Sequence, residues 1–110
     1  MIALDPRAAA RAATAASPLR PATAIVHDVA DARLVVFRLA PGQEVPMHRS
    51  ASTVLLTVLE GDGMLAGAGG ERPCTTGDVV VYAPDEPHGM RATRGELLLL
   101  ATITPRPGER

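Results

Sequence analysis

The sequence predicts an all-β fold, a small barrel preceded by a short arm, and three observations support this. Runs rich in Val, Leu, Ile and Thr recur at short, regular spacing between residues 24 and 103. Clusters of Gly, Asp and Pro separate these runs as turns would, for example at residues 61–63 and 76–78. No helical periodicity of apolar residues continues after residue 18. Short strands with turn signals between them are typical of a β-sandwich or β-barrel.

Residues 1–23 are expected to form an arm and linker outside the barrel. The first 18 residues are rich in Ala, which favours helix, and Asp5-Pro6 fits the N-cap and first position of a short helix. Ser17-Pro18 should end this helix, because the residue before a proline disfavours the helical conformation. Since so short a helix is marginal in water, the arm should either dock on the barrel or be disordered.

The barrel is expected over residues 24–104, followed by a flexible polar tail at residues 105–110. Its expected strands are 24–27, 32–39, 44–49, 53–60, 64–68, 79–83, 88–93 and 96–103. The expected breaks are 61–63, 67–70, 76–78, 84–87 and 93–95. The run 32–39 is apolar on both faces, as expected of a strand covered on each side.

Composition excludes several kinds of partner. The 110 residues suffice for one domain with one core, and 46% of them are apolar. The Lys and Arg positions are all Arg, and they are scattered along the chain. Among Phe, Tyr and Trp, the chain has only Phe37 and Tyr82. This pattern offers neither a basic patch nor a stacking platform for nucleic acid. No apolar run approaches the roughly 20 residues of a membrane span.

Cys74 is the only cysteine, so the chain has no internal disulfide. A lone thiol fits a reducing compartment, and we expect a cytoplasmic protein. A nucleophilic cysteine needs a basic neighbour that lowers its pKa, so we interpret Cys74 as an incidental residue at a strand edge.

Two histidines follow glycines at related spacings. Gly42 is followed after five residues by His48, and Gly77 is followed after ten residues by His88. With Gly61 closing the first segment, this layout resembles the two motifs of the cupin superfamily, in its small, single-domain form. The first motif of that family is Gly-x5-His-x-His-x3–4-Glu-x6-Gly, and the second is Gly-x5-Pro-x-Gly-x2-His-x3-Asn.

The resemblance covers residues 24–104 but departs from the family at metal-binding positions. Ser50 stands where the second histidine is expected and Val54 where the glutamate is expected. Ala92 replaces the closing asparagine, and the proline of the second motif is shifted by one position. The resemblance implies a jelly-roll barrel whose two motif strands pair and whose histidines point inward toward a divalent metal.

Carried over position by position, only His48 and His88 match metal ligands. Ser50 offers a weak hydroxyl and Val54 offers nothing, whereas catalytic zinc and non-haem iron sites normally use three protein ligands. We therefore expect either a divalent metal (Zn, Fe, Ni or Mn) held by His48 and His88, or no metal. Glu44, Asp85 and Glu86 are the acidic residues that could contribute from the rim.

A pocket histidine in an apolar barrel should have a lowered pKa, so it should be neutral near pH 7 and able to accept a proton. The resemblance implies precedent in metal-free sugar epimerases, which pair such a base with an acid such as tyrosine. Tyr82 is the candidate acid. Asp85-Glu86 are candidates to orient His88.

Strand alternation places two further residues around the histidines. Met90 lies two residues from His88 and should share its face, so we expect it in the pocket. Arg49 and Arg91 alternate with the inward positions and should point outward to solvent. His27 lies outside both motifs and is expected at the surface or at an interface.

Three functions remain open from the sequence. The leading hypothesis is a barrel that binds a small polar or anionic molecule, with or without a metal, in a pocket of His48, Ser50, Val54, Tyr82, His88 and Met90. The first alternative is an enzyme, either a metal-dependent oxygenase or isomerase or a metal-free acid/base isomerase. The second is a structural or sensing barrel. We expect an isologous homodimer through the apolar strands 24–27 and 33–39, because an uncovered edge invites aggregation.

Overall fold

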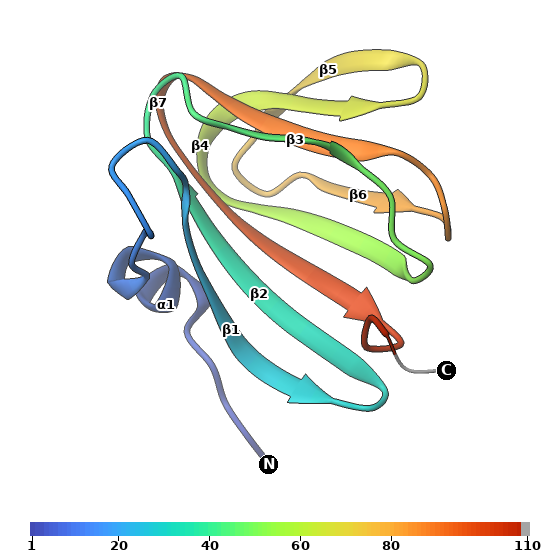
Figure 1. The fold of residues 1–110 in the computed structure, drawn as a ribbon. Helices are drawn as coiled ribbons and strands as arrows, with labels where there is room; N and C mark the ends of the chain where they lie inside the picture. The colour runs from blue at the N-terminus through green and yellow to red at the C-terminus, as the bar shows by residue number, and fades with distance from the viewer. Residues whose placement is uncertain (109–110) are drawn as a thin grey trace.

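A computed structural model describes residues 1–108 of the chain, and it shows an antiparallel β-barrel with one short helix (Figure 1). The elements follow in the order α1 (Pro6–Ala12), β1 (Ala22–Val29), β2 (Ala32–Leu39), β3 (Glu44–His48), β4 (Thr53–Gly67), β5 (Gly70–Thr75), β6 (Val79–Tyr82) and β7 (His88–Thr104). The all-β prediction is confirmed, and the strands form the jelly-roll arrangement that the sequence predicts.

Two long strands, β4 and β7, carry the barrel. The second half of β7 lies between β2 and the first half of β4, and β1 and β6 complete that half of the sheet. The first half of β7 lies between β3 and the second half of β4, which pairs on its other side with β5. Because both long strands bend midway, the two halves of one sheet face each other across the core (Figure 1).

The bends fall near residues 61–63 and 93–95, where the sequence predicts breaks between separate strands. Both of these predicted breaks are wrong. Residues 61–63 lie inside β4 and residues 93–95 lie inside β7. Gly61 pairs with Leu97 and Gly63 pairs with Ala92, so residues 93–96 of β7 lie opposite Asp62 alone. This irregularity is a bulge, and a bulge bends a strand without ending it.

Strand β5 was missed by the sequence analysis, which assigned residues 70–75 to no strand. Its sequence is polar and contains Pro73, both of which argue against a strand. Pro73 is tolerated because β5 pairs only with β4 and is an edge of the sheet. Cys74 therefore lies in a strand and is buried in the core, where burial raises the pKa of its thiol.

The main core fills the space between the two half-sheets. It consists of the inward side chains of β2, β4, β6 and β7 with Cys74 of β5, among them Leu39, Val54, Leu56, Val58, Leu65, Tyr82, Met90, Leu97, Leu99 and Ala101. Alternate residues of the same strands face outward and form a second, smaller cluster. Val36, Leu59 and Leu98 pack there against Ala10 of α1. The two-faced apolar pattern of residues 32–39 thus has a cover on each side.

Helix α1 docks on this outer face. Asp5 is its N-cap and Pro6 its first residue, as predicted, and the Asp5 carboxylate accepts a hydrogen bond from the amide of Ala8. The helix ends at Ala12, before the predicted stop at Ser17-Pro18. It ends early because the backbone is already extended at Ala13, and Thr14 forms a β-bridge with Thr23 of β1.

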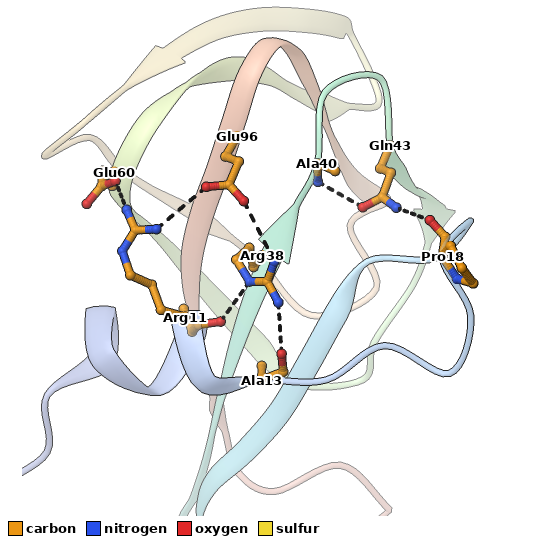
Figure 2. A network of polar contacts seen from close by, with 9 residues as sticks. Arg11, Ala13, Pro18, Arg38, Ala40, Gln43, Glu60 and Glu96 are labelled. Atoms are coloured by element: carbon orange, nitrogen blue, oxygen red, sulfur yellow. Dashed lines mark hydrogen bonds and ion pairs between the residues drawn. The ribbon is translucent and has the colours of Figure 1, made fainter.

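Arginine side chains hold the helix in place (Figure 2). Arg38 donates to the carbonyl oxygens of Ala10 (3.3 Å) and Ala13 (2.9 Å) at the end of α1, and its guanidinium lies 3.7 Å from Glu96. Arg11 reaches back from the helix to Glu60 and Glu96. The arm is therefore part of the folded unit within the described residues.

The end of the chain folds back on the barrel. Ser52 donates to the carbonyl oxygen of Pro105 (2.6 Å), and the amide of Arg106 donates to Ala30 (3.1 Å). Of the tail predicted to be flexible, Pro105 and Arg106 make these contacts, and residues 109–110 lie outside the described part. Within residues 1–108, no helix has both the length and the apolar character needed to cross a bilayer.

Candidate functional site

The two motif histidines lie directly opposite each other. His48 ends β3 and His88 begins β7, and their Cα positions are partners in the pairing of these strands. Gly89 makes this approach possible: a Cβ at that position would lie 2.9 Å from the carbonyl oxygen of Val45. The strand pairing brings together two residues that are forty positions apart in the sequence.

The rings meet edge to face, with centroids 4.2 Å apart and planes at 62°. Each ring is fixed by its own chain, because Nδ1 of His48 donates to the carbonyl oxygen of Pro46 (2.9 Å) and Nδ1 of His88 donates to that of Glu86 (3.0 Å). A carbonyl can only accept, so Nδ1 carries the proton in each ring. Nε2 is then an acceptor in the neutral form of either ring.

The two histidines differ in burial. His88 is 4% exposed, whereas His48 lies at the exposed rim. Burial lowers the pKa of His88, and the neighbouring His48 acts in the same direction, against the backbone carbonyl and charge of Glu86. The buried ring is therefore held in its neutral form over a wider pH range than a free imidazole. The Glu86 contact comes from the main chain. Its carboxylate accepts from the amide of Ala83 instead, and does not orient His88.

Both rings line a cavity of about 380 Å³. Its walls are mostly apolar and come from β2, β4 and β7, with Phe37, Val54, Leu56, Met90, Ala101 and Ile103. Its polar edge consists of His48, His88, and Arg49 and Ser50 from the loop between β3 and β4. Of the predicted pocket residues, the cavity thus brings together His48, Ser50, Val54, His88 and Met90.

Tyr82, the remaining predicted pocket residue, is not among the cavity residues. Its ring lies 5.0 Å from that of His88, but its hydroxyl donates to the carbonyl oxygen of Ala66 (2.8 Å). Burial, with the nearby charge of Glu86, raises the pKa of Tyr82. The hydroxyl is therefore bonded to the backbone of Ala66, which does not line the cavity, and is not placed to act as the acid partner of His88.

Arg49 was predicted to point outward, but it lies at the cavity mouth. Its guanidinium donates to the carbonyl oxygen of Asp85 (2.8 Å), and the amide of Asp85 donates to Ser50 (2.7 Å). These two bonds tie the β3–β4 loop to the β6–β7 loop. Strand alternation fails for Arg49 because β3 ends one residue earlier, at His48.

The tail is another part of the site that sequence reasoning missed. Pro107 and Gly108 line the cavity, held there by the contacts of Pro105 and Arg106 described above. Nothing in the composition of this segment distinguishes it from a loose end. Phe37 and Ile103, in contrast, alternate with outward residues on β2 and β7 and could have been assigned to the barrel interior by strand parity.

The donor atoms around the histidines do not fit the usual metal site of a barrel of this type. Within residues 1–108, no group of three His, Cys, Asp or Glu side chains is placed to hold a metal ion. Val54 lines the cavity where the resemblance expects a carboxylate. Two imidazoles would leave a metal with two protein ligands, fewer than catalytic zinc or iron normally has.

Comparison with protein-family models matches residues 35–103 to the cupin domain. This span contains both histidines and all strands from β3 to β6, with most of β2 and β7. Among curated proteins, none matches the sequence of this chain.

Several solved structures share the fold. An RmlC-like cupin protein from Desulfovibrio desulfuricans is 32% identical, with a TM-score of 0.76 over 86% of this chain and 91% of that one. A protein described as a predicted oxalate decarboxylase from Thermotoga maritima is 25% identical, with a TM-score of 0.73 over 77% and 80% of the two chains. An uncharacterized protein with a double-stranded β-helix domain from Klebsiella pneumoniae is 22% identical, with a TM-score of 0.79 over 88% and 87%.

Proposed function

This chain belongs to the cupin family, and from that premise we propose that it binds a small anionic or polar molecule in the cavity around His48 and His88. Members of the family bind small molecules or metal ions, and some are enzymes. A cavity of about 380 Å³ lies in the usual size range of small-ligand sites.

One observation supports an anion in particular: within the described residues, the cavity is lined by one cation and by no carboxylate. Arg49 supplies the positive charge at the mouth. Arg49 is itself exposed, but the apolar walls beside it keep water from part of its surroundings, so its charge is less screened than on an open surface. The same charge disfavours a metal cation.

An enzymatic role has weaker support. A metal-dependent oxygenase or isomerase would need a third ligand, which Val54 does not provide. A metal-free isomerase has a base in the buried, neutral His88. It lacks a partner acid, since the Tyr82 hydroxyl is bonded to Ala66. Binding is therefore the function that the residues support best.

Thermal unfolding of protein made without a histidine tag and treated with EDTA tests the proposal. A panel of small carboxylates and phosphates should contain compounds that raise the melting temperature, because a ligand that binds only the folded state stabilises it. The shift should be lost or strongly reduced in Arg49→Gln, which removes the cation of the cavity, and kept in His27→Ala, a half-exposed histidine of β1 outside the cavity. If no anion shifts unfolding, or if both variants respond alike, the proposal fails. Stoichiometric metal in protein that has not been treated with EDTA, if it disappears in His48→Ala, would favour a metalloenzyme instead.

We also propose that the chain forms an isologous dimer through β1 and β2, at residues 24–27 and 33–39. Strand β1 is an edge, and within the described residues only Thr23 pairs on its outer side, with Thr14. Ile25 and Val29 on this strand are exposed. Pairing with a second copy would cover both the open backbone groups and these side chains. Light scattering that gives only the monomer mass at micromolar concentration would contradict it.

A further inference from the structure

The hydrogen-bonding capacity of the cavity restricts its ligand more narrowly than its charge does. In both histidines the Nδ1 proton is used by a backbone carbonyl. In its neutral form each ring therefore offers an Nε2 lone pair to a ligand and no N–H group. A bare carboxylate, which only accepts hydrogen bonds, has no favourable contact with these atoms.

Nε2 of His88 needs a partner. The ring is buried, and Nε2 makes no hydrogen bond within the described residues. Every fully buried side-chain nitrogen or oxygen in this part of the chain has a partner, so the unbonded Nε2 keeps some accessible surface, and we infer that it is reached from the cavity that its residue lines. His48 lies at the exposed rim, where water can satisfy its Nε2. His88 is thus the position at which a ligand donor would gain most.

Arg49 complements this acceptor. Its bond to Asp85 fixes the guanidinium at the mouth, and the guanidinium keeps further N–H groups for an anion. A carboxylate is a planar acceptor that fits the guanidinium fork. The polar edge therefore combines a site for an anion with a separate site for a donor.

The apolar walls of the cavity can bind neither an anion nor a hydrogen-bond donor. Phe37, Val54, Leu56 and Ile103 present only apolar atoms. A ligand with many hydroxyls would leave several of them without partners there, at a cost of about 1–3 kcal/mol each. The cavity has room for about a dozen water molecules at roughly 30 Å³ each, which corresponds to a compact organic acid.

Building on the proposed function, we propose that the ligand is a small hydroxy monocarboxylate with a compact apolar body. Its carboxylate binds Arg49 at the mouth. Its hydroxyl donates a hydrogen bond to Nε2 of His88. Its apolar body packs against Val54, Leu56 and Phe37.

Matched acids that differ by one hydroxyl test this directly by titration calorimetry on EDTA-treated protein. The pairs are mandelate with phenylacetate, and 2-hydroxy-3-methylbutanoate with 3-methylbutanoate, using each enantiomer of the hydroxy acids. We expect one enantiomer to bind about tenfold more tightly than its deoxy partner, as one buried hydrogen bond allows. Gluconate, which is polyhydroxylated, should bind more weakly than either hydroxy acid.

Two variants separate the roles of the residues. In His88→Ala the hydroxy acid and its deoxy partner should bind with about equal affinity, while phenylacetate still binds. Arg49→Gln should weaken both members of a pair by a similar factor and leave the preference intact. His27→Ala should change neither. If His88→Ala does not fold, the ratio in the native protein and in Arg49→Gln still decides the question.

The outcomes distinguish this inference from the proposed function. Equal binding of hydroxy and deoxy acids, or tighter binding of gluconate, overturns the inference while anion binding stands. A hydroxyl preference that appears only after zinc is added also overturns it, because the hydroxy acid would then be chelating a metal. If none of the acids binds and no phosphate binds, the proposed function fails together with the inference.

Discussion

His48 and His88 are partners across the pairing of β3 and β7, with ring centroids 4.2 Å apart. His48 is nevertheless exposed, whereas His88 is buried, with 4% of its surface exposed. The pair is therefore asymmetric. His48 is exposed to water at the rim. His88 contacts the His48 ring from the buried side, and burial disfavours the charged form of His88. The asymmetry has consequences for stability as well as for binding.

The first prediction concerns acid. Because burial lowers the pKa of His88, the folded protein binds a proton at this site less readily than the unfolded chain does. His88 therefore contributes stability above the ordinary histidine pKa of about 6.5, and this contribution is lost as the pH falls through the lowered value. Urea denaturation between pH 8 and pH 5 should show the free energy of unfolding of the native protein falling over this window. The fall should be smaller in His88→Gln.

His27→Gln is the control for general effects of losing a histidine, and it should retain the native pH dependence. Titration of the ring proton of His88 by NMR gives an independent measurement. A midpoint at or above 6.5 would contradict the assignment of a lowered pKa.

The second prediction adds the missing carboxylate. Val54 lines the cavity with both histidines, at the position where the family motif has glutamate. Val54→Glu should bind Zn²⁺ at least about tenfold more tightly than the native chain, because it supplies a third ligand. Without metal it should be less stable by roughly 2 kcal/mol or more, since a carboxylate is placed among apolar side chains. Calorimetric titration with Zn²⁺ and denaturation with and without metal measure both effects.

Val54→Gln has nearly the same size but no charge, so it should lose stability without gaining zinc affinity. Equal zinc affinity in the native chain and Val54→Glu would show that the two histidines are already sufficient, and the binding proposal would need a metal.

The sequence could predict the histidine pair because spacing within each motif survives even where ligands are lost. Gly42 and Gly77 set the turns before the two motif strands, and His48 and His88 follow at family-like distances. The closeness of the rings then follows from strand pairing. The side chain of Arg49 could not be placed in the same way, because its position depends on a contact with Asp85 from a distant loop.

Strand ends were the weakest part of the sequence prediction, for a physical reason. Gly61-Asp62-Gly63 has the local chemistry of a turn, and the same residues also suit a bulge. Which of the two forms is decided by pairing with β7, since Gly61 has Leu97 opposite and Gly63 has Ala92. Such partners are distant in sequence and are invisible to a local pattern.

The third prediction uses two glycines with the same backbone conformation. Gly61 has φ of +96° and Gly77 has φ of +93°, so alanine strains the backbone at either position. At Gly61 an added Cβ would lie 2.1 Å from the carbonyl oxygen of Glu96, whereas at Gly77 nothing lies within 4 Å. Gly77→Ala should cost about 1–2 kcal/mol of stability. Gly61→Ala should cost clearly more, about 3 kcal/mol or above, because the bulge must open.

Chemical denaturation of both variants measures this difference. The two costs share the backbone strain, so their difference reports the close approach of β7 to β4 alone. If the two variants lost equal stability, that approach would not constrain the bend of the barrel.

The last prediction separates two arginines that hold helix α1 (Figure 2). Arg38 donates to two carbonyl oxygens at the helix end, which lose their partners in Arg38→Ala. The expected cost is about 1–3 kcal/mol, with faster amide exchange in α1. Arg11 pairs with carboxylates that are largely exposed, so Arg11→Ala should cost under about 1 kcal/mol.

Salt distinguishes the two mechanisms. The carbonyl acceptors of Arg38 are neutral, so most of its contribution should persist in 1 M NaCl. The contribution of Arg11 should disappear there, because the Debye length falls to about 3 Å. Arg33→Ala, which removes an exposed pair with Asp28 on β1, provides a control away from the helix. If the cost of Arg38→Ala disappeared in salt as well, the ion pair with Glu96, which joins β2 to β7, would account for the cost, and the carbonyl contacts with α1 would contribute little.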